Sequence, residues 1–381
     1  MTDYKNNDII SYKVRKKGGV KMKGYKYRIF PTDEQKIKID KTINCCRYVW
    51  NGFLALKEFR YKTFKENVGY NKMSSVLTQV KKADDFLKEV DSTALQQTLR
   101  QLDNTYQMFF KKKCRYPRFK NKKNPKDSYK TTTCKIKDDK VLIPKVGLID
   151  IVWSREIKGK ILSATISKTH TEKYFISFCT DEVTEHLPVL DKEIGIDLGL
   201  KTFAVCSDEQ EFKAPKPMWK YIDRLKRLQR KLSKKKNKTS NRYKKLKLQI
   251  ALLHERIANI RRDFLHKLST KLIQENQLIC LEDLNVKGMT KNHKLARAIL
   301  DCGFWMFIEM LKTKANMYGR QIVQIDRWYP SSKTCHKCGY IKEDLTLKDR
   351  VYICPECGEI IDRDLNASIN ILTIGRQSIR G

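Results

Sequence analysis

Hydrophobic and polar residues alternate along YKYRIF, residues 25–30, which predicts a β-strand. PTDEQ follows, with Thr32 placed as an N-cap and Gln35 three residues later, and this capping box predicts the start of a helix. Apolar residues then recur at helical spacing to about residue 113, most clearly in SSVLTQV and STALQQTLRQLDNTYQMFF. The pattern therefore predicts one strand followed by a long helical region.

From about residue 129 to 180 the hydrophobic period changes to two, which predicts short strands separated by polar or glycine breaks. The stretch before them, CRYPRFKNKKNPK at 114–126, is basic, aromatic and interrupted by proline, as in a loop. We expect the strand at 25–30 to join the later strands in one sheet. The prediction is a small, wedge-like β-barrel over 22–190 that carries a helical recognition insertion at about 45–128.

Strands and helices alternate in the second half of the chain. We expect three short strands over 192–214, a long helical hairpin with its turn at 234–241, and a buried strand at 277–286. A helix, a strand, a cysteine-rich module and a last helix (DLNASINIL) follow. This order predicts an α/β domain over 191–381, interrupted by the module at about 331–360.

Residues 1–21 look unlike the rest of the chain, and Met22 opens a second credible beginning. Lys-Gly-Gly at 17–19 can be encoded by a nucleotide sequence that is also a bacterial ribosome-binding site, a few nucleotides before the Met22 codon. We therefore expect residues 1–21 to be a mis-called N-terminal extension. N-terminal sequencing of the natively expressed protein tests this expectation.

The 381 residues include 80 Lys and Arg against 43 Asp and Glu, a formal net charge of +37. An excess of this size, spread over the whole chain, favours a polyanionic partner over a merely solvated surface. Nucleic acid is favoured over a membrane, because the sequence has no amphipathic anchor, no signal peptide and no apolar run of roughly 18 residues. We expect a soluble bacterial protein of the cytoplasm, associated with the nucleoid.

Two basic segments are candidates for contact with nucleic acid. From 224 to 247, thirteen of 24 residues are Lys or Arg and none is acidic, whereas a solvated helix normally includes acids for i,i+4 pairs. In the loop at 114–126, aromatic residues could stack on bases or fill a seam between sheet and helices, and both interpretations stay open. The predicted nucleic-acid-binding residues are Arg118, Lys120, Arg224, Arg227, Arg230, Lys231, Lys234 and Lys235.

Four of the twelve cysteines form two CxxC pairs, CHKC at 335–338 and CPEC at 354–357. Two such pairs match a four-thiolate zinc site more closely than two disulfides or a redox pair, and a glycine follows each pair where the backbone must turn tightly. We predict a zinc ribbon with a structural Zn²⁺, because four thiolates leave no open position. The predicted zinc ligands are Cys335, Cys338, Cys354 and Cys357.

Three acidic residues stand at informative places: Asp197 and Glu282 end predicted strands, and Asp364 lies where the last helix starts. Singly, each could be a turn cap, a strand-end charge or a helix cap. Together they suit a phosphodiesterase that holds two Mg²⁺ ions on carboxylate oxygens, with Asp197 as the shared ligand. We predict Asp197, Glu282 and Asp364 as the catalytic, Mg²⁺-binding residues.

The strand motif EIGIDLGLKTFAV at 193–205 also opens the nucleotide site of sugar kinases and heat-shock ATPases. Those enzymes need a second Asp-Gly phosphate loop and a Gly-rich adenosine motif, and the sequence has neither. The sequence instead has many lysines and a cysteine-rich module. The pattern therefore favours a nuclease of the ribonuclease H superfold over an ATPase.

Several segments together resemble the TnpB family, the OrfB proteins of small bacterial insertion sequences, which are related to compact type V CRISPR effectors. The resemblance covers about residues 22–375 and rests on YRIFPTDEQ, RYVWN, GIDLGLKTFAV, LICLEDLNVKGM, WYPSSKTCHKCG, YICPEC and DRDLNASINI. It implies a RuvC-like nuclease domain, with catalytic acids at Asp197, Glu282 and Asp364. Asp362 is the alternative candidate for the third catalytic acid. Asp364 is preferred, because the family's last acid stands two residues before the asparagine, here Asn366.

The resemblance implies an RNA-guided, Mg²⁺-dependent DNA endonuclease encoded by a transposable element. Such a protein binds a guide RNA transcribed from the element's end and cuts double-stranded DNA next to a short flanking motif with one RuvC-like site. We expect a monomer bound to its RNA. The alternatives are a nucleic-acid-binding regulator of transposition that does not cleave, and a transposase that acts directly in strand transfer.

Overall fold

The computed structural model describes residues 22–122, 127–182, 185–346 and 348–380. The chain divides into two compact units, with the division at residues 183–184. The predicted N-terminal extension, residues 1–21, lies outside the described residues. Within the described ranges, no helix is long and apolar enough to cross a membrane.

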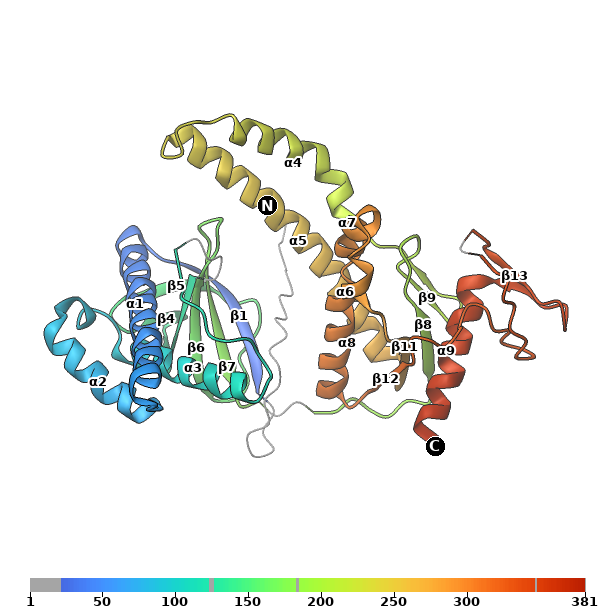
Figure 1. The fold of residues 1–381 in the computed structure, drawn as a ribbon, viewed down its shortest axis with the longest axis horizontal. Helices are drawn as coiled ribbons and strands as arrows, with labels where there is room; N and C mark the ends of the chain where they lie inside the picture. Colours follow the sequence, from blue (N-terminus) through green and yellow to red (C-terminus); the bar gives the residue numbers. More distant parts are fainter. Residues whose placement is uncertain (1–21, 123–126, 183–184, 347, 381) are drawn as a thin grey trace. The chain divides into compact units, whose positions relative to one another are not determined.

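The first unit is built on an antiparallel sheet of seven strands in the order β2-β6-β7-β1-β5-β4-β3 (Figure 1). The strand predicted at 25–30 joins this sheet between β5 and β7, as expected. No pairing of β2 with β3 occurs among the described residues, so closure into a barrel stays a prediction. The strands are β1 (Lys23–Phe30), β2 (Asp127–Thr131), β3 (Lys135–Lys137), β4 (Lys140–Ile143), β5 (Gly147–Val152), β6 (Ile161–Lys168) and β7 (Tyr174–Thr180).

Helices fill the segment between β1 and β2. The predicted capping box is confirmed: the Thr32 hydroxyl accepts from the Gln35 backbone N–H, and Gln35 Oε1 accepts from the Thr32 N–H. A cap of this kind stabilises a helix by about 1 kcal/mol, which fixes where the first helix begins. The helices are α1 (Asp33–Phe64), α2 (Tyr70–Ala83), the short 3₁₀ turn η1 (Asp85–Leu87) and α3 (Ser92–Phe110).

The second unit contains a mixed sheet in the order β10-β9-β8-β11-β12. Strands β8, β11 and β12 are parallel, so their carboxyl ends meet at one edge of the sheet, while β9 pairs antiparallel with both β8 and β10. The predicted strands over 192–214 and 277–286 are thereby confirmed. Their bounds are β8 (Glu193–Asp197), β9 (Ala204–Cys206), β10 (Glu211–Phe212), β11 (Leu278–Glu282) and β12 (Gln321–Ile325).

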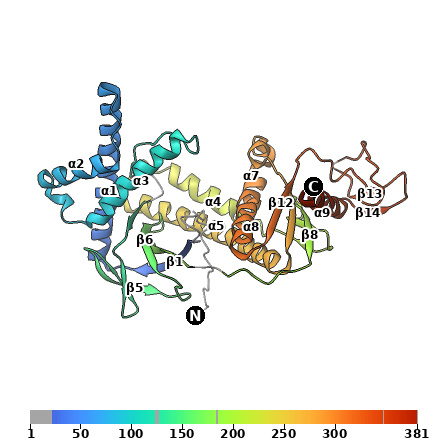
Figure 2. The ribbon, with the colours of Figure 1, turned by 90° about the horizontal axis from the view of Figure 1, so that it is seen from below.

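Helices cover both faces of this sheet (Figures 1 and 2). Ile279 and Leu281 of β11 pack with α5 and α8 on one face, and the alternate residues Leu278 and Cys280 pack with α9 on the other. The close approach of α9 requires glycine, because a Cβ on Gly195 would lie 2.1 Å from the Ser368 carbonyl oxygen. The helices are α4 (Pro217–Ser233), α5 (Asn241–Glu275), α6 (Val286–Met289), α7 (His293–Cys302), α8 (Phe304–Tyr318) and α9 (Arg363–Arg380).

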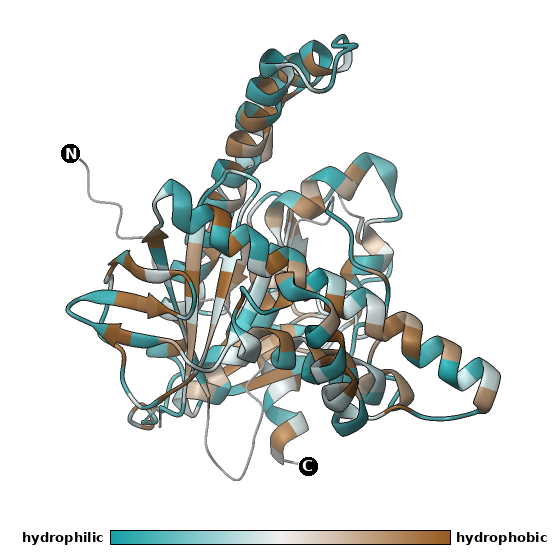
Figure 3. Ribbon diagram, turned by 90° about the vertical axis from the view of Figure 1, so that its left-hand side faces the viewer, coloured by the Kyte–Doolittle hydropathy of each residue, from teal (hydrophilic) through white to brown (hydrophobic). Residues whose placement is uncertain are grey.

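The predicted helical hairpin consists of α4 and α5. Leu225 of α4 packs against Leu253 and Ile257 of α5, so these apolar residues hold the two arms of the hairpin together. Figure 3 shows this hairpin at the top of the view, with hydrophilic (teal) and hydrophobic (brown) residues interspersed along its helices. A smaller module follows β12 and contains the antiparallel strands β13 (Val351–Ile353) and β14 (Ile360–Asp362).

Candidate active site and metal centre

The two predicted strand-end acids lie side by side at the carboxyl edge of the second sheet. Asp197 is the last residue of β8 and Glu282 the last residue of β11, and the register of these neighbouring parallel strands pairs Ile196 with Leu281 just before them. Asp364 lies in the first turn of α9, which packs against both strands. In parallel sheets this edge is where ligands bind.

The charges of the three acids act on one another. Burial raises the pKa of Asp197 to about 8, and the nearby carboxylates of Glu282 and Asp364 contribute to the rise, against the opposing charge of Arg363. Burial also raises the pKa of Glu282, although a hydrogen bond from Ser331 opposes this. The site therefore concentrates negative charge that a cation would neutralise.

Arginines hold Asp364 from two sides. Arg363 Nε and Nη2 lie 3.0 and 2.7 Å from its Oδ1, and Arg350 Nη1 lies 3.7 Å from its Oδ2. Asp362, the rival for the third place, has a different role, because its Oδ1 accepts hydrogen bonds from the backbone N–H groups of Asp364 and Leu365. It caps α9, as one of the simpler interpretations of the sequence allowed.

A serine that sequence reasoning did not single out orients Glu282. Ser331 is buried, and its hydroxyl donates a hydrogen bond to Glu282 Oε1. The backbone of Ser331 is held in turn by Asn370 of α9, whose Nδ2 donates to the Ser331 carbonyl oxygen at 2.8 Å. The loop before the cysteine module thus links α9 to the strand-end acid.

The three acids suit hard divalent cations better than a soft metal. Asp197, Glu282 and Asp364 offer carboxylate oxygens, which Mg²⁺ prefers, and burial, followed by the charges of the other two acids, raises the pKa of Asp197. The carboxylate oxygens of the three acids lie farther apart than the ligand atoms of a single bound ion would. Among the described residues, groups of three or more candidate ligand atoms within 4.8 Å of one another are limited to the cysteine cluster.

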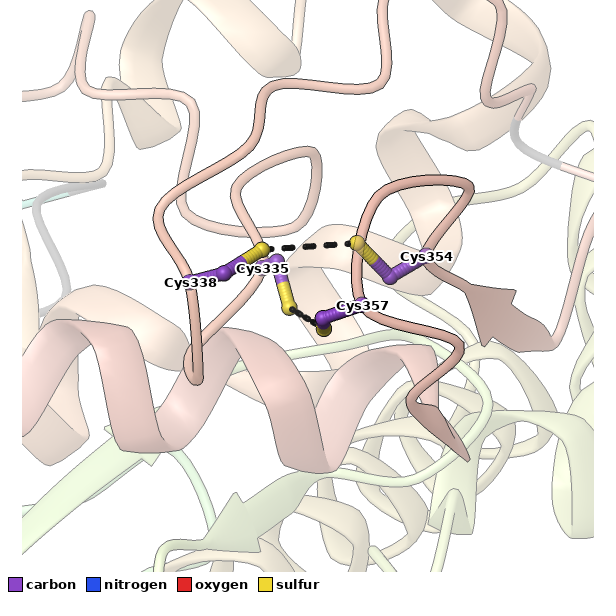
Figure 4. A group of neighbouring side chains, drawn as sticks. All are labelled: Cys335, Cys338, Cys354 and Cys357. Atoms are coloured by element: carbon purple, nitrogen blue, oxygen red, sulfur yellow. Dashed lines mark hydrogen bonds between the residues drawn. The ribbon is translucent and has the colours of Figure 1, made fainter.

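The four predicted zinc ligands come together (Figure 4). Cys335 Sγ lies 3.7 Å from Cys357 Sγ, Cys338 Sγ lies 3.5 Å from Cys354 Sγ, and all four sulfurs lie within 4.8 Å of one another. Sulfurs bound about 2.3 Å from one tetrahedral Zn²⁺ are separated by roughly this spacing. The donor set therefore fits zinc.

Two details of the cysteine cluster agree with the zinc interpretation. Gly339 and Gly358, directly after the two pairs, have φ of +80° and +71°, where side chains are disfavoured. Burial would raise the pKa of Cys354, but hydrogen bonds from backbone N–H groups and from Cys338 and Cys357 lower it, while the pKa values of Cys338 and Cys357 are raised. His336 hydrogen-bonds to Asn366 of α9 and is not part of the cluster.

The basic arm of the hairpin presents its charges to solvent. Within the described part of the chain, none of its six predicted contact residues forms an ion pair, and Lys231, Lys234 and Lys235 line a hollow of about 450 Å³ together with Arg242 and Lys245. Five of the six are exposed and Lys235 is half-buried. These six are Arg224, Arg227, Arg230, Lys231, Lys234 and Lys235.

The two predicted residues of the first unit differ in their surroundings. Arg118 is exposed, whereas Lys120 is half-buried with its Nζ 3.8 Å from the centre of the Trp50 ring, and burial lowers its pKa to about 8. Lys120 also lines a cavity of about 680 Å³ between α1, α3 and β2. In the same loop, Tyr116 packs edge-on against Tyr106 of α3 but is 43% exposed, and Phe119 is 55% exposed, so neither ring is buried between the sheet and the helices.

Three family profiles match the chain. The profile of OrfB_IS605, described as "Probable transposase", matches residues 177–293, and "Cas12f1-like, TNB domain" matches 304–371. A third, described as "Helix-turn-helix domain", matches 22–66, a range that in this structure contains β1 and the single helix α1.

Two relatives align over nearly their whole length. A "Putative RNA-guided DNA endonuclease" of Streptomyces pristinaespiralis is 37% identical over 360 residues, 93% of this chain and 89% of the relative. "Putative RNA-guided DNA endonuclease InsQ" of Escherichia coli (strain K12) is 31% identical over 376 residues, 93% of this chain and 92% of the relative. Identity of this extent and coverage shows common membership of one family.

A solved Cas12f1–sgRNA–target DNA complex aligns over 92% of this chain and 98% of the solved chain, with 17% identity and a TM-score of 0.36, too low to bear on the fold. The family rests instead on the two full-length relatives, on further relatives described as "TnpB-like protein", and on the matched profiles. The chain belongs to the TnpB (insertion-sequence OrfB) family.

Proposed function

We propose that this protein is an RNA-guided DNA endonuclease that hydrolyses phosphodiester bonds at a RuvC-like site formed by Asp197, Glu282 and Asp364. The observation that carries the proposal is the convergence of these acids, from two parallel strand ends and one helix start, at a site where burial, and then the charges of Glu282 and Asp364, raise the pKa of Asp197 to about 8. The full-length relatives, described as RNA-guided DNA endonucleases, support the reaction and its substrates.

The chain's own residues would hold the metal and orient the reacting groups. Asp197 lies on β8, between β9 and β11, and would be the ligand common to the bound ions. The Ser331 hydroxyl fixes one oxygen of Glu282, and the paired arginines fix Asp364. Bound Mg²⁺ would supply an activated water and charge stabilisation for the leaving oxygen.

The charge of the protein suits two nucleic-acid partners. A guide RNA and a target DNA together present far more phosphates than one strand, and the net charge of +37 and the basic residues of α4 match such a demand. Proteins of this kind hold the guide–target duplex by its backbone. We propose that the active form is a monomer bound to its RNA.

The test is to express the gene with its native downstream flank, purify the protein and sequence the RNA that accompanies it. One discrete RNA that ends at the element boundary is the expected result, and cleavage of DNA matching that RNA then follows directly. Heterogeneous cellular RNA, or none, would leave a binding protein or an unguided nuclease and would overturn the proposal.

A further inference from the structure

Trp328 presents a large aromatic surface to solvent. Its side chain is 84% exposed, and between residues 306 and 339, all of them described, it is the sole large hydrophobic residue so exposed. A single indole among polar neighbours does not form the contiguous apolar patch that a protein partner would need. Its exposure therefore requires another explanation.

The loop that carries Trp328 is fixed rather than loosely attached. Asp326 Oδ1 accepts a hydrogen bond of 2.7 Å from the Trp328 backbone N–H. On one side of Trp328, Arg327 Nε lies 3.1 Å from Asp283 Oδ2; on the other, Tyr329 packs into the core beneath α9. The indole is thus held outward by a loop whose neighbouring residues are all anchored.

The same loop places Trp328 beside the candidate active site. Ser331, three residues later, donates to Glu282, and Arg327 pairs with Asp283, the residue that follows Glu282. Three residues span at most about 11 Å even when fully extended, so the Trp328 Cα lies within that distance of the Ser331 Cα. A nucleotide next to a phosphate bound at Glu282 is within reach of an aromatic side chain on this loop.

We propose that Trp328 is a stacking platform for one unpaired base of the DNA strand, adjacent to the phosphate that is cut. Every base has a face that can stack on an aromatic ring, so such a contact positions a strand without reading its sequence. Arg327 beside it adds a positive charge near the backbone of the same strand. The inference rests on the proposed function, because it assumes that the acids cut DNA.

The experiment combines variants of Trp328 with abasic sites in the target. The RNA-bound protein would be assayed on pre-opened targets that carry one abasic nucleotide at each position around the cut, using Trp328→Ala, Trp328→Phe and the matched control Trp305→Ala, an exposed tryptophan on α8. Loss of a stacked base costs roughly 5- to 150-fold in kcat/KM.

We expect the kcat/KM of Trp328→Ala to fall by this factor, whereas Trp328→Phe should retain most activity and Trp305→Ala should match the wild type. An abasic nucleotide at one position should lower the kcat/KM of the wild type by the same factor as Trp328→Ala does. The same abasic target should cause no further loss in Trp328→Ala, because both changes remove the same contact. Unchanged activity of Trp328→Ala, or losses that simply add at every position, would overturn the inference.

A second readout does not depend on cleavage. With EDTA present, 2-aminopurine would be placed in turn at each target position around the expected cut, and at one position it should be quenched in complexes of the wild type and Trp305→Ala but not of Trp328→Ala. Equal fluorescence in all three would overturn the inference. If the wild type cuts no target at all, the proposed function fails, and this measurement still decides whether Trp328 stacks on a base.

Discussion

At the scale of single residues, the site is dominated by the carboxyl group of Asp197. Its pKa of about 8 lies far above the value of roughly 3.9 in an unfolded chain, so the metal-free folded state binds a proton that the unfolded state releases. Because the folded state then binds more protons, the free energy of unfolding of the metal-free protein falls as pH rises between about 4 and 8.

Asp197→Asn should remove this part of the pH dependence and stabilise the metal-free protein at pH 8 relative to the wild type. Urea unfolding with EDTA at pH 6 and pH 8 measures it, with the exposed Asp223→Asn on α4 as the control. An identical loss of stability from pH 6 to pH 8 in wild type and Asp197→Asn would contradict the burial and charge repulsion inferred for Asp197.

The sequence was most informative where chemistry follows directly from local pattern. The Thr32 cap, the four cysteines and the strand-end positions of Asp197 and Glu282 were all predicted, because each depends on spacing within a short segment. The contact of Ser331 with Glu282 was not, since it joins residues 49 positions apart. For the same reason the stacking of Lys120 on Trp50 was missed, and with it the burial of a residue predicted to meet nucleic acid.

At the scale of elements, the loop after β12 connects α9 to the strand end that carries Glu282. Ser331→Ala should raise the Mg²⁺ concentration needed for half-maximal cleavage by roughly tenfold or more, because a hydrogen bond to a charged group contributes about 1.5–3 kcal/mol. Mn²⁺ binding, followed by electron paramagnetic resonance, should weaken in parallel.

Two controls separate positioning from a general loss of structure. Ser332→Ala alters the neighbouring hydroxyl and should leave Mg²⁺ dependence unchanged, and Ser331→Thr should restore much of what Ser331→Ala loses. Unaltered Mn²⁺ affinity in Ser331→Ala would show that the serine does not orient Glu282.

The cysteine module depends on its metal. Cys338→Ser or Cys354→Ser should release zinc and destabilise the second unit, since a structural zinc site contributes directly to folding. Metal content measured by atomic absorption tests this, with Cys114→Ser, an exposed thiol outside the cluster, as the control. Full zinc occupancy in both module variants would refute the four-thiolate assignment.

At the scale of the whole molecule, the net charge of +37 should govern affinity for nucleic acid. Replacing Arg227, Arg230 and Lys234 of the hairpin together by glutamine should weaken binding and reduce the slope of log K against log salt by about 2–3, at 0.7–0.9 per lost phosphate contact. A triple variant at the ion-paired Lys36, Lys88 and Lys267 is the matched control. An equal change of slope in both would mean that the hairpin has no special role.

The most direct measurement compares cleavage and binding by Asp197→Ala in the RNA-bound protein. Loss of several kcal/mol of metal-dependent stabilisation should lower DNA cleavage by at least about a thousand-fold, while affinity for RNA and target DNA stays within a few-fold of the wild type. Cleavage that persists in Asp197→Ala would place the nuclease site elsewhere, and the carboxylates at the edge of the second sheet would then not be its catalytic residues.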